Sequence, residues 1–169
     1  MIARAASLAS ALTLGVALLP SLASAHDVTL DDIRIAHPFA TPTPPGAPNG
    51  AAYLDITAGD EPATLVGASS PISGVVELHD MIMDDGNMQM RKLDAIEIEA
   101  GETLTMRPGG GYHLMLLGLE ETLVEGETFP LTLEFAEQGE VEIEVGVQEA
   151  NAGGEAADGH HDHEHEHDH

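Results

Sequence analysis

The chain has 169 residues, which is enough for one domain with its own hydrophobic core. Thirty acidic residues against five basic ones give a formal net charge of −25 at pH 7, so nucleic acids and anionic lipid surfaces are poor partners. The charge favours a cation or a basic protein surface as partner, although solubility alone explains it equally well. Because cysteine is absent, the chain forms neither disulfides nor a thiolate metal site.

The first 25 residues predict a signal peptide for export to the periplasm. Arg4 supplies a short positive region, an apolar run follows, and Ala23-Ser24-Ala25 has the small residues of a cleavage site. A membrane anchor is the weaker interpretation, because the run ends at Pro20 and is too short to span a bilayer. We therefore expect a mature chain that begins at His26 and has no membrane span.

Residues 26–149 predict an all-β domain of about eight or nine short strands. The expected strands cover residues 26–36, 51–58, 63–68, 75–83, 88–98, 102–107, 113–117, 129–135 and 140–147. The proline-rich stretch 37–50 is expected to be a long loop. Short strands with turn residues at regular spacing are typical of an antiparallel sandwich or barrel.

Residues 150–169 are expected to be a disordered tail, because from Asn151 onward no apolar residue larger than alanine is available for burial. Histidine alternates there with Asp and Glu, which predicts Cu(II) or Zn(II) ligands at His160, His161, His163, His165, His167 and His169. The alternative is a purely solvating tail. His26, once N-terminal, is a further candidate because its free amine and imidazole together can chelate Cu(II).

One stretch, Glu77 to Met115, holds six of the seven methionines together with His79 and His113. Methionine usually fills a core, and a lone His-x-Met pair is usually packing. Histidine combined with several methionines is a different pattern, since thioether sulfur suits Cu(I) and imidazole also suits copper. Zn(II) would more often recruit carboxylate or thiolate beside its histidines. The stretch therefore predicts a Cu(I) site.

Strand geometry brings these side chains toward one point. Asp85-Gly86 predicts a two-residue hairpin turn, which sets Met81 opposite Met90. His79 then lies diagonal to Met90 on the same face of the ribbon, within reach of a shared ion. In the segment 113–115 the histidine and the methionine also share a face. We expect the resulting site at a loop-rich edge of the domain.

The spacing of these residues resembles the motif of the periplasmic copper chaperone PCu(A)C family, which is His, ten residues, Met, about twenty-one residues, and His-x-Met. Here ten residues separate His79 from Met90, and twenty-two separate Met90 from His113. The segments AHDVTLDDIRIAHPFA and TPPGAPNGAAYLDI extend the resemblance over most of the domain. The extra residue is attributed to the third glycine of 109–111, and Phe39 stands where the family usually has tryptophan.

The resemblance implies a cupredoxin-like antiparallel β-sandwich or barrel with Greek-key connections. It also implies a periplasmic copper chaperone, not an enzyme, that delivers copper in the assembly of the binuclear copper centre of cytochrome c oxidase. Its partner would be an oxidase subunit or another copper chaperone. The implied Cu(I) ligands are His79, Met90, His113 and Met115. The remaining methionine candidates are expected to pack beside the site or to assist copper handover: Met81, Met83 and Met88.

Two other functions compete with this interpretation. The first is periplasmic buffering of copper or zinc, or copper tolerance, in which the histidine-rich tail binds the metal. The second, a copper oxidoreductase, is less favoured because electron-transfer copper sites use a cysteine thiolate. No Ser/His/Asp or paired-carboxylate arrangement stands out as catalytic.

Overall fold

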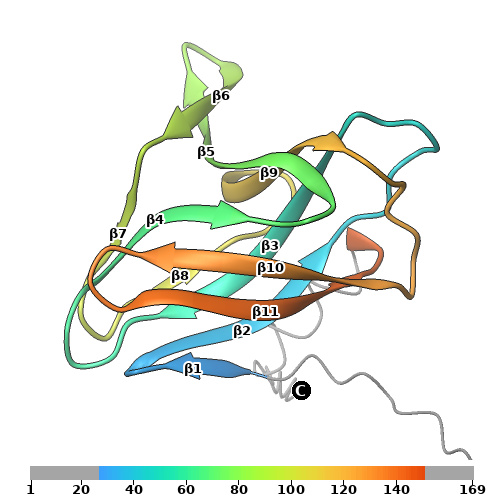
Figure 1. Cartoon of the computed structure of the whole chain (residues 1–169). Helices are drawn as coiled ribbons and strands as arrows, with labels where there is room; N and C mark the ends of the chain where they lie inside the picture. Colours follow the sequence, from blue (N-terminus) through green and yellow to red (C-terminus); the bar gives the residue numbers. More distant parts are fainter. Residues whose placement is uncertain (1–26, 151–169) are drawn as a thin grey trace, which may run out of the picture.

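The computed structural model describes residues 27–150, which form eleven β-strands (Figure 1). The expected signal peptide, His26 and the six tail histidines lie outside these residues. The strands are β1 (Val28–Leu30), β2 (Ile33–Ala40), β3 (Asn49–Thr57), β4 (Ala63–Ser69), β5 (Ser73–Asp84), β6 (Asn87–Leu93), β7 (Ile96–Ile98), β8 (Thr103–Thr105), β9 (Gly111–Leu119), β10 (Thr128–Phe135) and β11 (Gly139–Val147). Between residues 27 and 150, no helix has the length and apolar character that a membrane crossing requires.

Seven of the strands close into a barrel. They pair in the order β2, β11, β10, β4, β5, β9 and β3, and β3 pairs again with β2. The described pairings are antiparallel apart from β11 with β2, where Gly146 and Val147 run parallel to Phe39 and Ala40. The expected all-β barrel is thus confirmed, with one parallel pair where the last strand meets the second.

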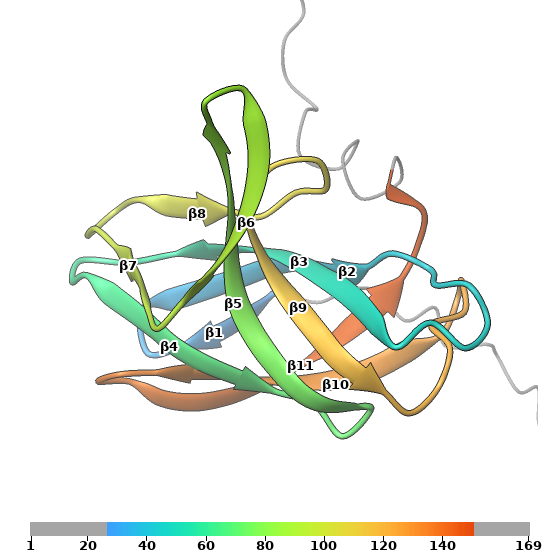
Figure 2. The ribbon, with the colours of Figure 1, turned by 90° about the horizontal axis from the view of Figure 1, so that it is seen from above.

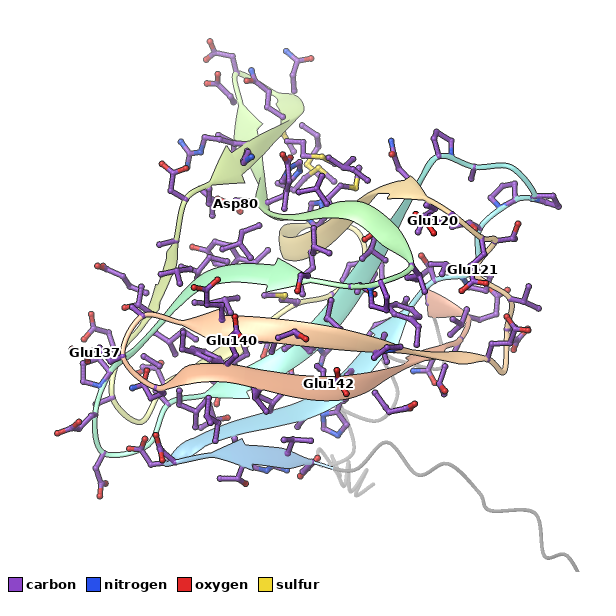
Figure 3. The ribbon with its side chains drawn as sticks, viewed as in Figure 1. Asp80, Glu120, Glu121, Glu137, Glu140 and Glu142 are labelled. Carbon is purple, nitrogen blue, oxygen red and sulfur yellow. The ribbon has the colours of Figure 1, made fainter. Side chains whose placement is uncertain are left out.

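The barrel interior is filled by aliphatic side chains that alternate along the strands. Fully buried residues include Ile33, Ile35, Leu54, Ile56, Leu65, Leu114, Leu116, Leu131, Leu133 and Val145. Along β11 the intervening residues are exposed carboxylates, among them Glu140 and Glu142 (Figure 3). This alternation is the one expected for a strand with one face in the core and one in water.

The loop expected over residues 37–50 is shorter than the sequence indicated. Strand β2 continues to Ala40, and its register with β3 shifts between Ala36 and Phe39. His37 adopts a positive φ of 50°, which marks a β-bulge at this point. Proline cannot donate a hydrogen bond to the ladder, but a bulge interrupts the ladder and therefore tolerates Pro38. The His-Pro pair therefore kinks the strand without ending it.

The C-terminal part of strand β5 extends beyond the barrel and forms a projecting hairpin with β6 (Figure 2). Asp85 and Gly86 have φ values of 48° and 81°, as a type I′ turn requires. The expected register is confirmed, because Met81 lies opposite Met90. On its other edge, the same part of β5 pairs with β9.

Candidate metal centre

Two histidines from distant parts of the sequence meet on adjacent strands. The antiparallel register of β5 and β9 sets His79 opposite His113. Their ring centroids are 5.6 Å apart in an edge-on arrangement, and both residues are buried. The extra residue in the glycine turn before His113 therefore leaves it in register with His79. Gly109 and Gly111 adopt positive φ values in this turn, which favours glycine at both positions.

The methionines lie beside this pair, in an open pocket of about 270 Å³. The pocket is lined by Thr41, Thr43, Asn49, Gly50, Ala51, Tyr53, Met81, Met90, Arg107, Gly109, Gly110, His113 and Met115. Three of the four expected ligands thus share one pocket. The fourth, His79, lies against the His113 ring and not in the pocket wall. Sulfur atoms gather in this region, beside the β5–β6 hairpin (Figure 3).

The candidate ligands lie on strands, whereas Thr41, Thr43, Gly109 and Gly110 of the pocket wall come from the adjoining loops. Met115 lies opposite Ala51 of β3 and Glu77 of β5, in the middle of a four-stranded patch of sheet formed by β6, β5, β9 and β3. Met106, by contrast, is fully buried in the core. The six clustered methionines therefore divide into one core residue and five on the hairpin or in the pocket.

The nitrogen atoms of His79 are arranged as those of a metal ligand commonly are. Its Nε2–H donates to Oε2 of Glu77 at 2.9 Å, whereas its Nδ1 is buried and has no hydrogen-bond partner. A carboxylate that accepts one ring N–H fixes the tautomer and leaves the other nitrogen with a lone pair for a metal. A buried unsatisfied nitrogen is costly, and a bound ion would satisfy it. His79 therefore fits a metal site.

The pKa values of His113 and Glu77 are both lowered, which favours cation binding at neutral pH. Burial lowers the pKa of His113, despite opposing contributions from the Gly111 carbonyl and Asp80. Its imidazole is then neutral and able to coordinate. The hydrogen bond from Lys92 and that from His79 lower the pKa of Glu77, so Glu77 is an ionised acceptor. Its other oxygen, Oε1, lies 2.7 Å from Nζ of Lys92.

Glu77 and Tyr53 were not among the site residues predicted from the sequence. Glu77 precedes His79 by two residues, so the two share a face of β5, and this spacing was the available signal. Tyr53 comes from β3, and its ring centroid lies 6.5 Å from that of His113. Nothing in the local sequence connects Tyr53 with His113, because β3 and β9 meet only in the closed barrel.

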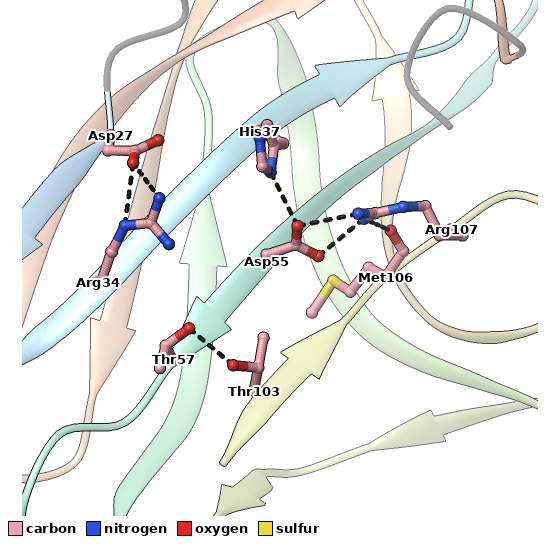
Figure 4. A network of polar contacts seen from close by, with 8 residues as sticks. All are labelled: Asp27, Arg34, His37, Asp55, Thr57, Thr103, Met106 and Arg107. Atoms are coloured by element: carbon pink, nitrogen blue, oxygen red, sulfur yellow. Dashed lines mark hydrogen bonds and ion pairs between the residues drawn. The ribbon is translucent and has the colours of Figure 1, made fainter. Parts of the chain in front are cut away.

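A second polar cluster shares Arg107 with the pocket wall (Figure 4). Arg107, in the pocket wall, donates two hydrogen bonds to the carboxylate of Asp55, at 2.8 and 2.9 Å. Nδ1 of His37 lies 3.0 Å from the same carboxylate, so this histidine has a structural partner. Burial favours a higher pKa for Asp55, but the hydrogen bonds from Arg107 and His37 outweigh it, and the pKa is lowered.

Replacing Glu77 with Gln should weaken Cu(I) binding by roughly tenfold, the scale seen when an outer-shell partner of a metal-ligating histidine is lost. The amide keeps the shape of the carboxylate but removes its charge and weakens its hold on the His79 N–H. Competition with a Cu(I) chelator measures the change. Glu97→Gln, on an exposed position of β7, is the matched control. Equal affinities in the two variants would remove Glu77 from the site.

Solved structures that resemble this chain are PCuAC domains, and its fold is of that class. The copper-bound PCuAC domain from PmoF2 aligns with a TM-score of 0.63 and 26% identity, over 73% of this chain and 98% of that domain. The solution structure of CuI-DR1885 from Deinococcus radiodurans aligns with a TM-score of 0.53 and 29% identity, over 78% and 84% of the two chains. These similarities confirm the expected cupredoxin-like fold.

A family model described as "Putative lipoprotein LpqE-like" matches residues 33–147, and the chain therefore belongs to the LpqE-like family. A relative named "Putative lipoprotein Lxx21020", from Leifsonia xyli subsp. xyli, is 28% identical over 139 residues. The aligned region covers 81% of this chain and 82% of the relative.

Proposed function

We propose that this chain is an exported copper chaperone that binds one Cu(I) ion and passes it to a copper-accepting protein. The proposed ligands are His79, Met90, His113 and Met115. The observation that carries the proposal is the register of β5 and β9, which sets the two histidines opposite each other beside a methionine-lined pocket. Copper in the PmoF2 and DR1885 domains, as their names state, supports the same choice of metal.

The chemistry of these side chains suits transfer better than permanent storage. Cu(I) is a closed-shell ion without a strong geometric demand, so two imidazoles and two thioethers satisfy it. Thioethers are neutral and carry no proton to lose on binding. Met90 is 46% exposed, whereas both histidines are buried. A partner's ligand therefore reaches the ion from the Met90 side before the histidines release it.

For the recipient, we propose the binuclear copper centre of cytochrome c oxidase, reached directly or through another copper chaperone. The PCu(A)C resemblance supports this choice. Export of the chain to the periplasm, with residues 1–25 as the signal peptide, would place donor and recipient in one compartment. The lipoprotein names of the family and of the Leifsonia relative support export.

The tail supports a second candidate function, the buffering of Cu(II) or Zn(II). Its six histidines alternate with acidic residues, a composition that provides several imidazole ligands at neutral pH.

Deleting residues 151–169 tests both functions in one measurement of metal stoichiometry. We expect the intact and the shortened chain each to retain one tightly bound Cu(I) in the domain. Only the intact chain should bind additional Cu(II) or Zn(II), and this binding should weaken as pH falls below about 6.5. Unchanged Cu(II) and Zn(II) stoichiometry would contradict the buffering function. Loss of Cu(I) from the shortened chain would contradict the domain site.

A further inference from the structure

The β5–β6 hairpin carries four methionines on one face of its two-stranded ribbon. They form two cross-strand pairs, an inner pair and an outer pair: Met81 with Met90, and Met83 with Met88. In a hairpin closed by a two-residue turn, both pairs occupy positions without backbone hydrogen bonds, where facing side chains approach most closely. Their Cβ atoms are then about 4.5–5.5 Å apart. Each pair thus presents two thioethers side by side.

Core packing does not explain the outer pair. Met83 is 66% exposed and Met88 is 50% exposed. The described residues include five exposed large hydrophobic side chains, and three of them are methionines on this ribbon. The choice of residue type therefore points to the sulfur atom, and not to apolar surface in general.

The outer pair lies next to the inner pair, which lines the proposed Cu(I) site. Met81 and Met90 of the inner pair line the same pocket as His113 and Met115. Successive pairs are two residues apart on each strand, which is a rise of about 7 Å. Methionine has three rotatable side-chain bonds, so thioethers of neighbouring pairs can reach one shared ion. The row of sulfurs therefore runs from the exposed hairpin to the buried histidines.

We propose that Met83 and Met88 form a second, weaker Cu(I) site, through which the ion reaches and leaves the pocket. This inference rests on the proposed function and adds a route for the ion. In each step a thioether of one pair binds the ion as a ligand of the neighbouring pair leaves. Copper stays Cu(I) throughout, and no proton or electron is transferred. The outer site is weaker because it lacks an imidazole, and its exposure makes it the first that a partner's ligand meets.

Methionine-methyl NMR on the full chain tests the second site, with Ag(I) as a redox-inert substitute for Cu(I). The first equivalent should shift the methyl signals of Met90 and Met115, and excess Ag(I) should then shift those of Met83 and Met88. If Met90 and Met115 do not respond, the proposed function fails, and this inference fails with it. If they respond while Met83 and Met88 stay unmoved in excess Ag(I), only this inference is overturned.

Exchange of Cu(I) with a small chelator such as bicinchoninate tests the route. The double variant Met83→Leu, Met88→Leu keeps the apolar surface but removes both sulfurs. We expect roughly tenfold slower uptake and release, with the equilibrium affinity of the pocket unchanged. Adding Ile82→Met and Gln89→Met restores the number of thioethers on the opposite face of the ribbon, and exchange should stay slow. Exchange as fast as in the wild type in the leucine variant would overturn the route.

Discussion

Replacing Met90 and Met115 together by leucine is expected to lower the Cu(I) affinity of the domain by at least about a hundredfold, since each change removes one soft ligand. Leucine has nearly the volume of methionine, and neither residue is fully buried, so the fold should be retained. Competition with a Cu(I) chelator in the chain without residues 151–169 measures the affinity.

Met106→Leu is the matched control for this double variant. It also removes a thioether, but from a fully buried position in the core, so Cu(I) affinity should not change. Undiminished affinity in the Met90→Leu, Met115→Leu variant would show that sulfur does not hold the ion. The assignment of this chain as a Cu(I) chaperone would then lose its main support.

Arg107→Met should destabilise the fold by roughly 2–3 kcal/mol at pH 7. The side chains of Asp55 and Arg107 are only 12% and 21% exposed, so removing the guanidinium leaves a largely buried carboxylate without its main partner. The folded-state pKa of Asp55 is lowered, so its pairing stabilises the fold above the unfolded pKa of about 3.9. This stabilisation is lost as the pH falls through the folded pKa. Urea denaturation of the apo-protein across this range measures it.

The exposed pair of Arg34 with Asp27 provides the comparison for Arg107. Arg34→Met should cost less than about 1 kcal/mol, since exposed ion pairs contribute little. The difference between wild type and Arg107→Met should shrink as Asp55 becomes protonated in the wild type. Equal losses in the two variants, or a loss that does not change with pH, would contradict the structural role assigned to the Arg107 cluster.

Local chemistry made the hairpin predictable from the sequence. An Asp-Gly pair adopts the positive φ values of a type I′ turn, and the turn fixes the register of the flanking strands. Met81 therefore faces Met90 in the structure as expected. The same local reasoning failed at His37-Pro38, where a proline signal indicates a loop. In the structure a bulge absorbs the proline and the strand continues.

Contacts between strands that are distant in the sequence were harder to predict. Alternation of apolar and polar residues shows which face of a strand is buried, but it does not show which strands are neighbours. The pairing of β11 with β2, which closes the barrel, was therefore not predicted. The proximity of His79 and His113 was implied by the family motif, and the structure adds their register. Glu77 was missed because its role depends on the orientation of the neighbouring imidazole.

Copper K-edge X-ray absorption on the chain without residues 151–169, loaded with one equivalent of Cu(I), tests the central claim most directly, because it reports the atoms bound to the metal. We expect a Cu(I) edge with both sulfur and nitrogen neighbours, and loss of the sulfur contribution in the Met90→Leu, Met115→Leu variant. A spectrum with only nitrogen and oxygen neighbours in the wild type would contradict the His/Met site.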